Sequence, residues 1–170
     1  MAPKKETVLK LTSMRYRAPG VTEEEFHDFA SRKHAPLAAV IQARHGALKA
    51  AQYHTPSSAR QLMKDKFPFV VRPGFTIDDH DIQISFWVRS TDTMLAILTD
   101  PDFQALVTGE DELKLADQDR GTLVTGWEEV YVEDGKVVNV EDGECMYGTY
   151  AERSACLRAG GAQGPNELPF

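Results

Sequence analysis

Alternation of apolar and polar residues predicts four strands along the chain. It is clearest at residues 82–89, where successive side chains divide between the two faces of a strand. One face carries Ile82, Ile84, Phe86 and Val88, and the other carries Gln83, Ser85, Trp87 and Arg89. This pattern is typical of a strand that is buried on at least one side. The other strands are predicted at residues 8–16, 48–54 and 122–132.

A helical period follows the first strand, over residues 23–44. Thr22 and Glu25 have the spacing of a capping box, which marks the start of the helix. Apolar residues at spacings of three and four predict a stripe that consists of Phe26, Phe29, Ala30, Leu37, Val40 and Ile41. Pro36 interrupts this helix, because proline has no N–H to donate and crowds the carbonyl four residues earlier. We therefore expect a kink near His34.

Turn and capping signals divide the rest of the chain. Two more helices are expected, one from Asp92 and one from Pro101, with Asp100 as the cap of the second. The other segments are expected to form a short helix (56–64), an irregular loop (67–81) and a solvated, mainly charged connection (110–120). Asp134-Gly135 predicts a hairpin turn.

The order of elements is strand, helix, strand, insertion, strand, helix, strand. This order predicts an α+β fold of the ferredoxin-like, split βαβ type with an antiparallel sheet. We expect one domain over residues 1–143 and a tail over residues 144–170, because no periodicity is visible in the latter. Helices on one side of a single sheet leave its other side bare. A second copy of the chain would cover that side, which favours a homodimer.

Composition and charge limit the classes of function. The chain has 170 residues, 42% hydrophobic and 26% charged, which fits one globular domain and excludes a disordered or collagen-like chain. A net charge of −7 disfavours nucleic acid and anionic membranes as partners. No stretch is long and apolar enough to predict a membrane span.

Two cysteines, Cys145 and Cys156, are too few for a disulfide scaffold. Their separation is short enough to allow a pair, so their redox state stays open. The polar residues 1–6 lack the apolar core of a secretory signal. We therefore expect a cytoplasmic protein.

Two of the five histidines are candidates for chemistry. His34 lies on the flank of the apolar stripe beside the expected kink, where an imidazole would serve as general acid or base; a satisfied core histidine is the equally weighted alternative. His54 ends the second strand, and strand ends that border loops often carry site residues. His27 is expected to be solvated and His45 to cap its helix.

Cofactor and metal motifs are missing from the sequence. It contains no GxGxxG, no phosphate-binding loop and no serine elbow, so no nucleotide cofactor is expected. His80 stands in Asp78-Asp79-His80-Asp81, which could bind a divalent metal, but a charged turn is the simpler interpretation. No metal is expected, because no matching set of ligands occurs elsewhere.

Several ordered blocks resemble a known family. They are Glu24-Glu25-Phe26, Lys33-His34-Ala35-Pro36-Leu37, Arg44-His45-Gly46, Gln52-Tyr53-His54-Thr55-Pro56-Ser57, Trp127-Glu128-Glu129-Val130 and Glu133-Asp134-Gly135-Lys136-Val137-Val138. Together they resemble the EthD-domain proteins encoded in fungal polyketide gene clusters, over about residues 6–140. The resemblance implies a dimeric α/β barrel and cofactor-free chemistry, since family members include decarboxylases of aromatic polyketide acids. It matches His34 to the family's helix-one histidine, and Tyr53 and His54 to its strand-two block.

The leading hypothesis is a cofactor-independent lyase that decarboxylates a polyketide-derived aromatic or β-keto acid. His34 would supply the proton, and His54 or Tyr53 would hydrogen-bond the carbonyl oxygen. Trp87, with Phe75 or Phe86, would stack on the flat substrate, and Arg44 or Arg60 would hold its carboxylate. The same groups would serve a polyketide cyclase or dehydratase. Two further hypotheses are a non-catalytic protein that binds a hydrophobic small molecule and a cofactor-free anthrone-type oxygenase.

Overall fold

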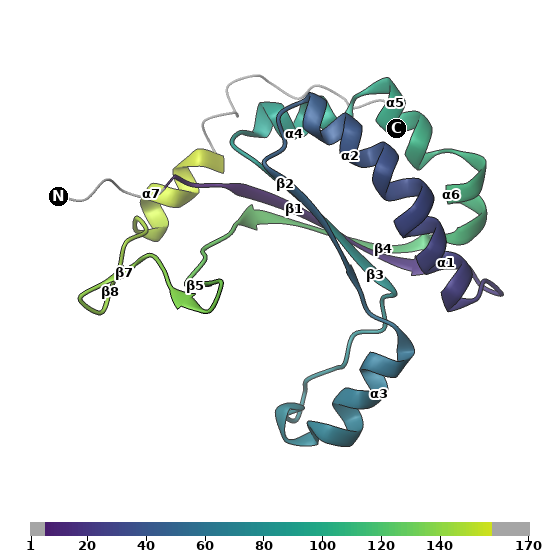
Figure 1. The fold of residues 1–170 in the computed structure, drawn as a ribbon, viewed down its shortest axis with the longest axis horizontal. Helices are drawn as coiled ribbons and strands as arrows, with labels where there is room; N and C mark the ends of the chain where they lie inside the picture. The colour runs from purple at the N-terminus through teal and green to yellow at the C-terminus, as the bar shows by residue number, and fades with distance from the viewer. Residues whose placement is uncertain (1–5, 158–170) are drawn as a thin grey trace.

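A computed structural model describes residues 6–157, except for the side chain of Cys156 (Figure 1). The pairing of Cys145 with Cys156 therefore lies outside the described residues. The strands are β1 (Leu9–Arg17), β2 (Lys49–His54), β3 (Ile82–Val88), β4 (Ala116–Trp127), β5 (Val132–Glu133), β6 (Lys136–Val137), β7 (Val140–Glu141) and β8 (Glu144–Cys145). The helices are α1 (Glu23–Phe29), the π-helical turn η1 (Ala30–His34), α2 (Ala35–Arg44), α3 (Ser57–Lys66), the 3-10 turn η2 (Pro68–Val70), α4 (Thr91–Leu98), α5 (Pro101–Val107), α6 (Glu110–Leu115), α7 (Tyr150–Ser154) and the 3-10 turn η3 (Ala155–Leu157).

The main sheet has four antiparallel strands in the order β2-β3-β1-β4. With α1–α2 after β1 and α4–α6 after β3, this order is the ferredoxin-like α+β fold that the sequence predicts. The expected faces of β3 are confirmed. Phe86 belongs to the core under the helices, whereas Trp87 lies on the other face, beneath the ammonium groups of Lys10 and Lys49.

The helices α1, α2 and α4–α6 cover one face of the sheet, and no helix within residues 6–157 covers the other (Figure 1). Two apolar clusters join the covered face to the helices. One consists of Leu9, Phe86, Val88 and Ile97, and the other of Phe26, Ala30, Ile82 and Ala116. On the uncovered side, α3 and the small hairpins of β5–β8 extend away from the sheet at opposite ends (Figure 1).

The expected kink in the first helix is a π-helical turn. The Ala35 N–H donates to the carbonyl of Ala30, five residues earlier, and Pro36 then stands in the first turn of α2, where its missing N–H is tolerated. The wider turn shifts the phase of the helix. Leu37 and Val40 were expected to be buried, but they are 58% and 67% exposed. Phe26, Phe29, Ala30 and Ile41 of the predicted stripe are buried, and His34, Ala38 and Gln42 join them on the inner face of the helix.

Residues 110–120 differ from the expected solvated connection. They form α6 and the first part of β4, and the side chain of Glu112 is buried. The prediction was wrong because α6 is short and packs between α1 and β4, so its mainly charged sequence conceals one inward-facing carboxylate. The fourth strand accordingly covers Ala116–Trp127 rather than residues 122–132.

The C-terminal part of the described chain is more ordered than a tail. The Asp134-Gly135 turn joins β5 to β6 as expected, and a second hairpin joins β7 to β8. The expected domain boundary at residue 143 falls in the turn of this second hairpin, and the division into domain and tail stays a prediction. Among residues 6–157, no helix has the length and apolar character to cross a membrane.

Candidate active site

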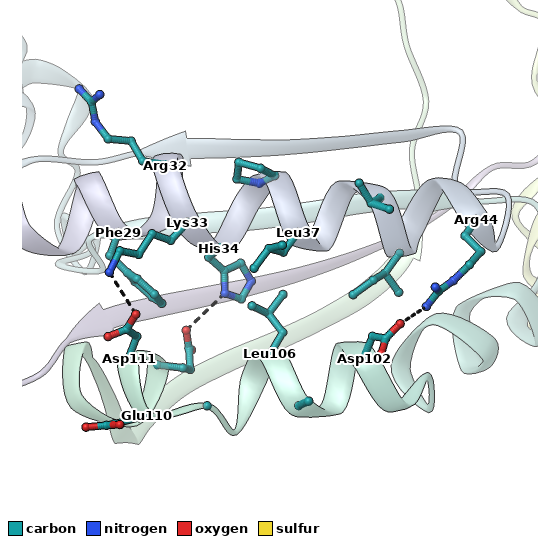
Figure 2. A pocket seen from close by; sticks show the side chains of 16 residues that line it. Phe29, Arg32, Lys33, His34, Leu37, Arg44, Asp102, Leu106, Glu110 and Asp111 are labelled. Carbon is teal, nitrogen blue, oxygen red and sulfur yellow. Dashed lines mark hydrogen bonds and ion pairs between the residues drawn. The ribbon is translucent and has the colours of Figure 1, made fainter.

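The π-helical turn places His34 on the buried side of the first helix. Its side chain is 6% exposed and points away from solvent toward α5 and α6 (Figure 2). The edge of its ring packs on Phe29, with 6.1 Å between ring centroids. The wide turn rotates the residues of α2 about the helix axis relative to those of α1. It therefore decides which residues of α2 lie on the same face as His34.

His34 faces a buried carboxylate. Its Nδ1 lies 3.4 Å from Oε2 of Glu112, and the other oxygen of Glu112 accepts a hydrogen bond of 2.7 Å from Arg15 on β1. The side chains of His34 and Glu112 are 7% and 6% exposed. No residue within 6–157 hydrogen-bonds to Nε2 of His34, and the contact between Nδ1 and Glu112 is an ion pair rather than a hydrogen bond. The imidazole is therefore oriented through one nitrogen and open at the other.

A mainly apolar cavity of about 440 Å³ lies between the sheet and the helices beside His34. Such a volume is within the usual range for small-molecule sites, about 300–1,000 Å³. Its lining consists of Leu11, Ser13, Arg15, His34, Gln42, Ile84, Phe86, Leu95, Leu98, Thr99, Phe103, Gln104, Val107 and Leu123. We call this space the main cavity.

His34 also lines two neighbouring hollows. A smaller one of about 240 Å³ lies between α2 and β2, and five alanines form much of its wall. A surface groove of about 900 Å³ separates α1–α2 from α5–α6, with the imidazole in its lining (Figure 2). Two ion pairs cross this groove, Lys33 to Asp111 at 3.2 Å and Arg44 to Asp102 at 2.9 Å (Figure 2). His34 thus lines a surface groove, the main cavity and the smaller hollow at once.

The structure brings only part of the expected site together. Phe86 shares the main cavity with His34, and Arg44 lies with His34 in the lining of the groove. The guanidinium of Arg44 already binds Asp100 at 2.7 Å as well as Asp102, and this pairing holds its pKa above the ordinary value. A substrate carboxylate at Arg44 would have to compete with both carboxylates.

His54 belongs to a separate histidine pair. Its Nδ1 lies 2.7 Å from Nδ1 of His27, and its Nε2 lies 3.3 Å from the hydroxyl of Ser31. Burial, together with the neighbouring His27, lowers the pKa of His54. His27 is half-buried with its Nε2 sealed from solvent, so the expectation of a solvated side chain was wrong, because β2 covers it. Neither histidine lines the three spaces beside His34.

Tyr53 and Trp87 lie on the opposite face of the sheet from His34. Tyr53 is 64% exposed there. Trp87 is buried beneath Lys10 and Lys49, and its indole N–H donates to Glu128 at 2.6 Å. Within one chain, these two aromatic side chains and His34 are separated by the sheet.

Three polar residues of the site were not predicted from the sequence: Glu112, Arg15 and Gln42. Nothing in the sequence marked Glu112 as a buried residue. Its burial depends on how the charged segment of α6 packs against α1. Arg15 sits in the first strand at a position that alternation alone assigns to the same face as Leu11. Gln42 follows His34 by eight residues, a spacing that places both on one face of a helix. The predicted apolar stripe, which assumed a regular helix, did not include this position.

His80 is buried in the irregular segment that precedes β3. Its Nδ1 lies 2.6 Å from Asp78, whose pKa is lowered by hydrogen bonds from the backbone and side chain of His80. Across residues 6–157, no group of three or more histidine, cysteine or acidic side chains is arranged to hold a metal ion.

Comparison with known proteins places this site in a family context. Residues 18–119 match the model of the EthD domain. A protein of Aspergillus terreus (strain NIH 2624 / FGSC A1156) named "Putative oxygenase" is 35% identical over 142 residues, 84% of this chain and 87% of the relative. The conidial pigment biosynthesis dehydratase EthD of Metarhizium robertsii is 30% identical over 81% of this chain and 94% of its own. Decarboxylase claH of Passalora fulva is 28% identical over 76% and 82%, respectively.

Proposed function

The chain belongs to the EthD family, and from that premise we propose that it is a cofactor-independent lyase that decarboxylates polyketide-derived aromatic or β-keto acids. The observation that carries the proposal is the placement of His34. One nitrogen of its imidazole faces the Glu112 carboxylate, and the other is left for a molecule in the adjoining cavity. This is the arrangement of a general acid or base with an orienting carboxylate.

The reaction needs one proton donor and no electron sink from the protein. The bond between the carboxyl carbon and the α-carbon breaks, and its electron pair moves through the neighbouring carbonyl to give an enolate and CO₂. Protonated His34 then delivers its Nε2 proton to the α-carbon, and the ring recovers a proton from water. Glu112 stabilises the imidazolium while His34 carries the extra proton.

The apolar walls of the main cavity support loss of CO₂. A carboxylate placed among side chains such as Leu11, Ile84 and Phe86 has lost its water, whereas the departing CO₂ is neutral and needs none. Arg15 also lines the cavity. Its guanidinium binds Glu112 and so offsets the negative charge of the Glu112 carboxylate. The negative charge of the substrate carboxylate spreads over the enolate as CO₂ leaves.

A dehydratase is the second candidate. In that reaction His34 would remove a proton beside a carbonyl and return it to a leaving hydroxyl group, so that water departs instead of CO₂. The relative from Metarhizium robertsii, whose name contains "dehydratase", favours this possibility. A cyclase would use the same proton transfers. An oxygenase, which the name of the Aspergillus terreus relative suggests, and a simple carrier are two further candidates.

One assay separates these functions. The purified protein is incubated with 1-hydroxyanthraquinone-2-carboxylic acid, whose keto tautomer is a β-keto acid, in D₂O, with and without oxygen. We expect release of CO₂ under both conditions and one deuterium at the vacated ring position, measured by mass spectrometry. A need for O₂ would indicate an oxygenase, and binding without turnover would indicate a carrier. Loss of water from a hydroxylated ketone without release of CO₂ from the acid would indicate a dehydratase.

A further inference from the structure

Gln42 is a buried amide without a partner. Its side chain is 4% exposed, on the inner face of α2. No side-chain hydrogen bond to Gln42 exists within residues 6–157. A buried polar group nearly always hydrogen-bonds to protein or to water, and the amide of Gln42 has no protein partner in the described chain. The amide is therefore available to a molecule that enters the space it lines.

The amide faces open space rather than packed protein. Neither of its polar atoms is among the side-chain atoms that are sealed from solvent, in contrast to Nδ1 of His34. Gln42 lines both the main cavity and the alanine-walled hollow, together with His34 and Ile84. A molecule that occupies the main cavity would therefore meet the imidazole and the amide in the same space.

The two groups lie too far apart to hold one atom. Gln42 follows His34 by eight residues, which is roughly 12 Å along a helix that rises about 1.5 Å per residue. A ligand that meets both must carry an oxygen at some distance from its reacting carbon. A fused-ring system with a ring oxygen at its far end has this form, whereas a single ring does not.

We propose that Gln42 binds a ring oxygen of a fused polycyclic substrate whose reacting carbon lies at His34. This inference rests on the proposed function for the identity of the reacting end, and it adds the residue that positions the far end of the substrate. The amide N–H donates to a ketone or quinone oxygen, which replaces the hydrogen bond that the free protein lacks. Gln42 is a positioning residue in this scheme, because it touches the substrate away from the carbon that accepts the proton.

A second glutamine provides a matched control. Gln52 on β2 lines the alanine-walled hollow, but its Nε2 donates to the carbonyl of Ala30 at 3.1 Å. That bond ties the π-helical turn to the sheet. Gln52 is therefore a partnered glutamine beside the same helix, and its replacement should alter stability rather than ligand choice.

The test compares two acids that differ in their ring oxygens. Anthraquinone-2-carboxylic acid has them and anthracene-2-carboxylic acid does not, and calorimetry measures the Kd of each. We expect the wild-type protein to prefer the quinone by about tenfold, the worth of one typical hydrogen bond. Gln42→Met should lose this preference through weaker binding of the quinone alone, and its Tm should stay close to that of the wild type, because no hydrogen bond within the protein is removed. Gln52→Met should keep the preference and melt at a lower temperature.

The outcomes distinguish this inference from the proposed function. A preference that survives in Gln42→Met, or a wild-type protein that binds neither acid or both equally, would overturn the role of Gln42 even where CO₂ release from the hydroxyanthraquinone acid is observed. Loss of the preference in Gln42→Met without any CO₂ release would support Gln42 and overturn the decarboxylase. If Gln42→Met does not fold, Gln42→Asn, which withdraws the amide by one methylene, is expected to lose the same preference.

Discussion

The carboxylate of Glu112 faces His34 across the interior of the domain, with 3.4 Å between Oε2 and Nδ1. The two residues come from helices on opposite sides of the surface groove, and both are buried. A carboxylate at one imidazole nitrogen fixes the orientation of the ring and favours the proton on that side. The other nitrogen is then the one that exchanges protons with a substrate. This relationship accounts for why a single histidine suffices in the proposed mechanism.

Replacement of His34 tests the proton-transfer step. His34→Ala is expected to fold and to lose about two to four orders of magnitude in the rate of CO₂ release, the usual contribution of a positioned acid or base. His45→Ala is the control, because His45 ends the same helix and holds Asp100 at 2.6 Å. It should lower the Tm and leave the rate per folded molecule unchanged. An unchanged rate in His34→Ala would remove His34 from the mechanism.

Replacement of Glu112 tests orientation separately from proton transfer. Glu112→Gln should lower kcat by at least about a hundredfold with little change in KM, because the ring loses the group that selects its tautomer. It also leaves the half-buried Arg15 without its charged partner, which should lower the Tm. The double variant Arg15→Met/Glu112→Gln should recover much of the lost Tm and none of the lost kcat. Recovery of both would show that Glu112 acts only through stability.

The strand pattern could be predicted from the sequence because it depends on local alternation. The faces of β3 followed from residues 82–88 alone, and the position of Phe86 under the helices agrees with them. The helix was harder, since a π-helical turn changes the phase of every residue after it. Leu37 and Val40 fit the predicted stripe and yet lie exposed in the surface groove, while Ala38 and Gln42 are buried.

The composition of the site could not be predicted, because it depends on contacts between distant segments. His34 stood out from its place beside Pro36. No such feature marks Glu112, since an acidic run is usually solvated. Only the folded structure shows which of its carboxylates is buried. Trp87 looked suitable for stacking on a substrate, but its face of the sheet is the one opposite the main cavity.

The sheet face without helices predicts a homodimer. Tyr53 and Val124 lie on that face with 64% and 51% of their surface exposed, around a buried hydrogen bond between Thr12 and Ser85. A second copy would cover these apolar side chains, and α3 and the β5–β8 hairpins flank the same side (Figure 1). Sedimentation equilibrium should give a dimer for the wild type and a monomer for Val124→Arg. Leu113→Arg, at an exposed position on α6, should remain dimeric. A monomeric wild type would contradict the expected barrel of two sheets.

The histidine pair predicts a pH dependence of stability. Burial first, and then the charge of His27, lower the pKa of His54 below its ordinary value of 6.5. As the pH falls through about 6.5, the unfolded chain binds a proton at His54 before the folded protein does, so the free energy of unfolding decreases. The decrease stops once the folded His54 is also protonated.

His54→Gln removes this titration and keeps a hydrogen-bonding group near His27. Its Tm should fall less than that of the wild type between pH 7.5 and pH 5.5, because the wild-type protein alone loses stability at His54 over this interval. His45 and His80, which lie beside Asp100 and Asp78, are present in both proteins, so their contributions cancel in the comparison. Equal changes in Tm for the two proteins would contradict the assignment to His54. A larger fall in Tm for His54→Gln than for the wild type would contradict the lowered pKa of His54.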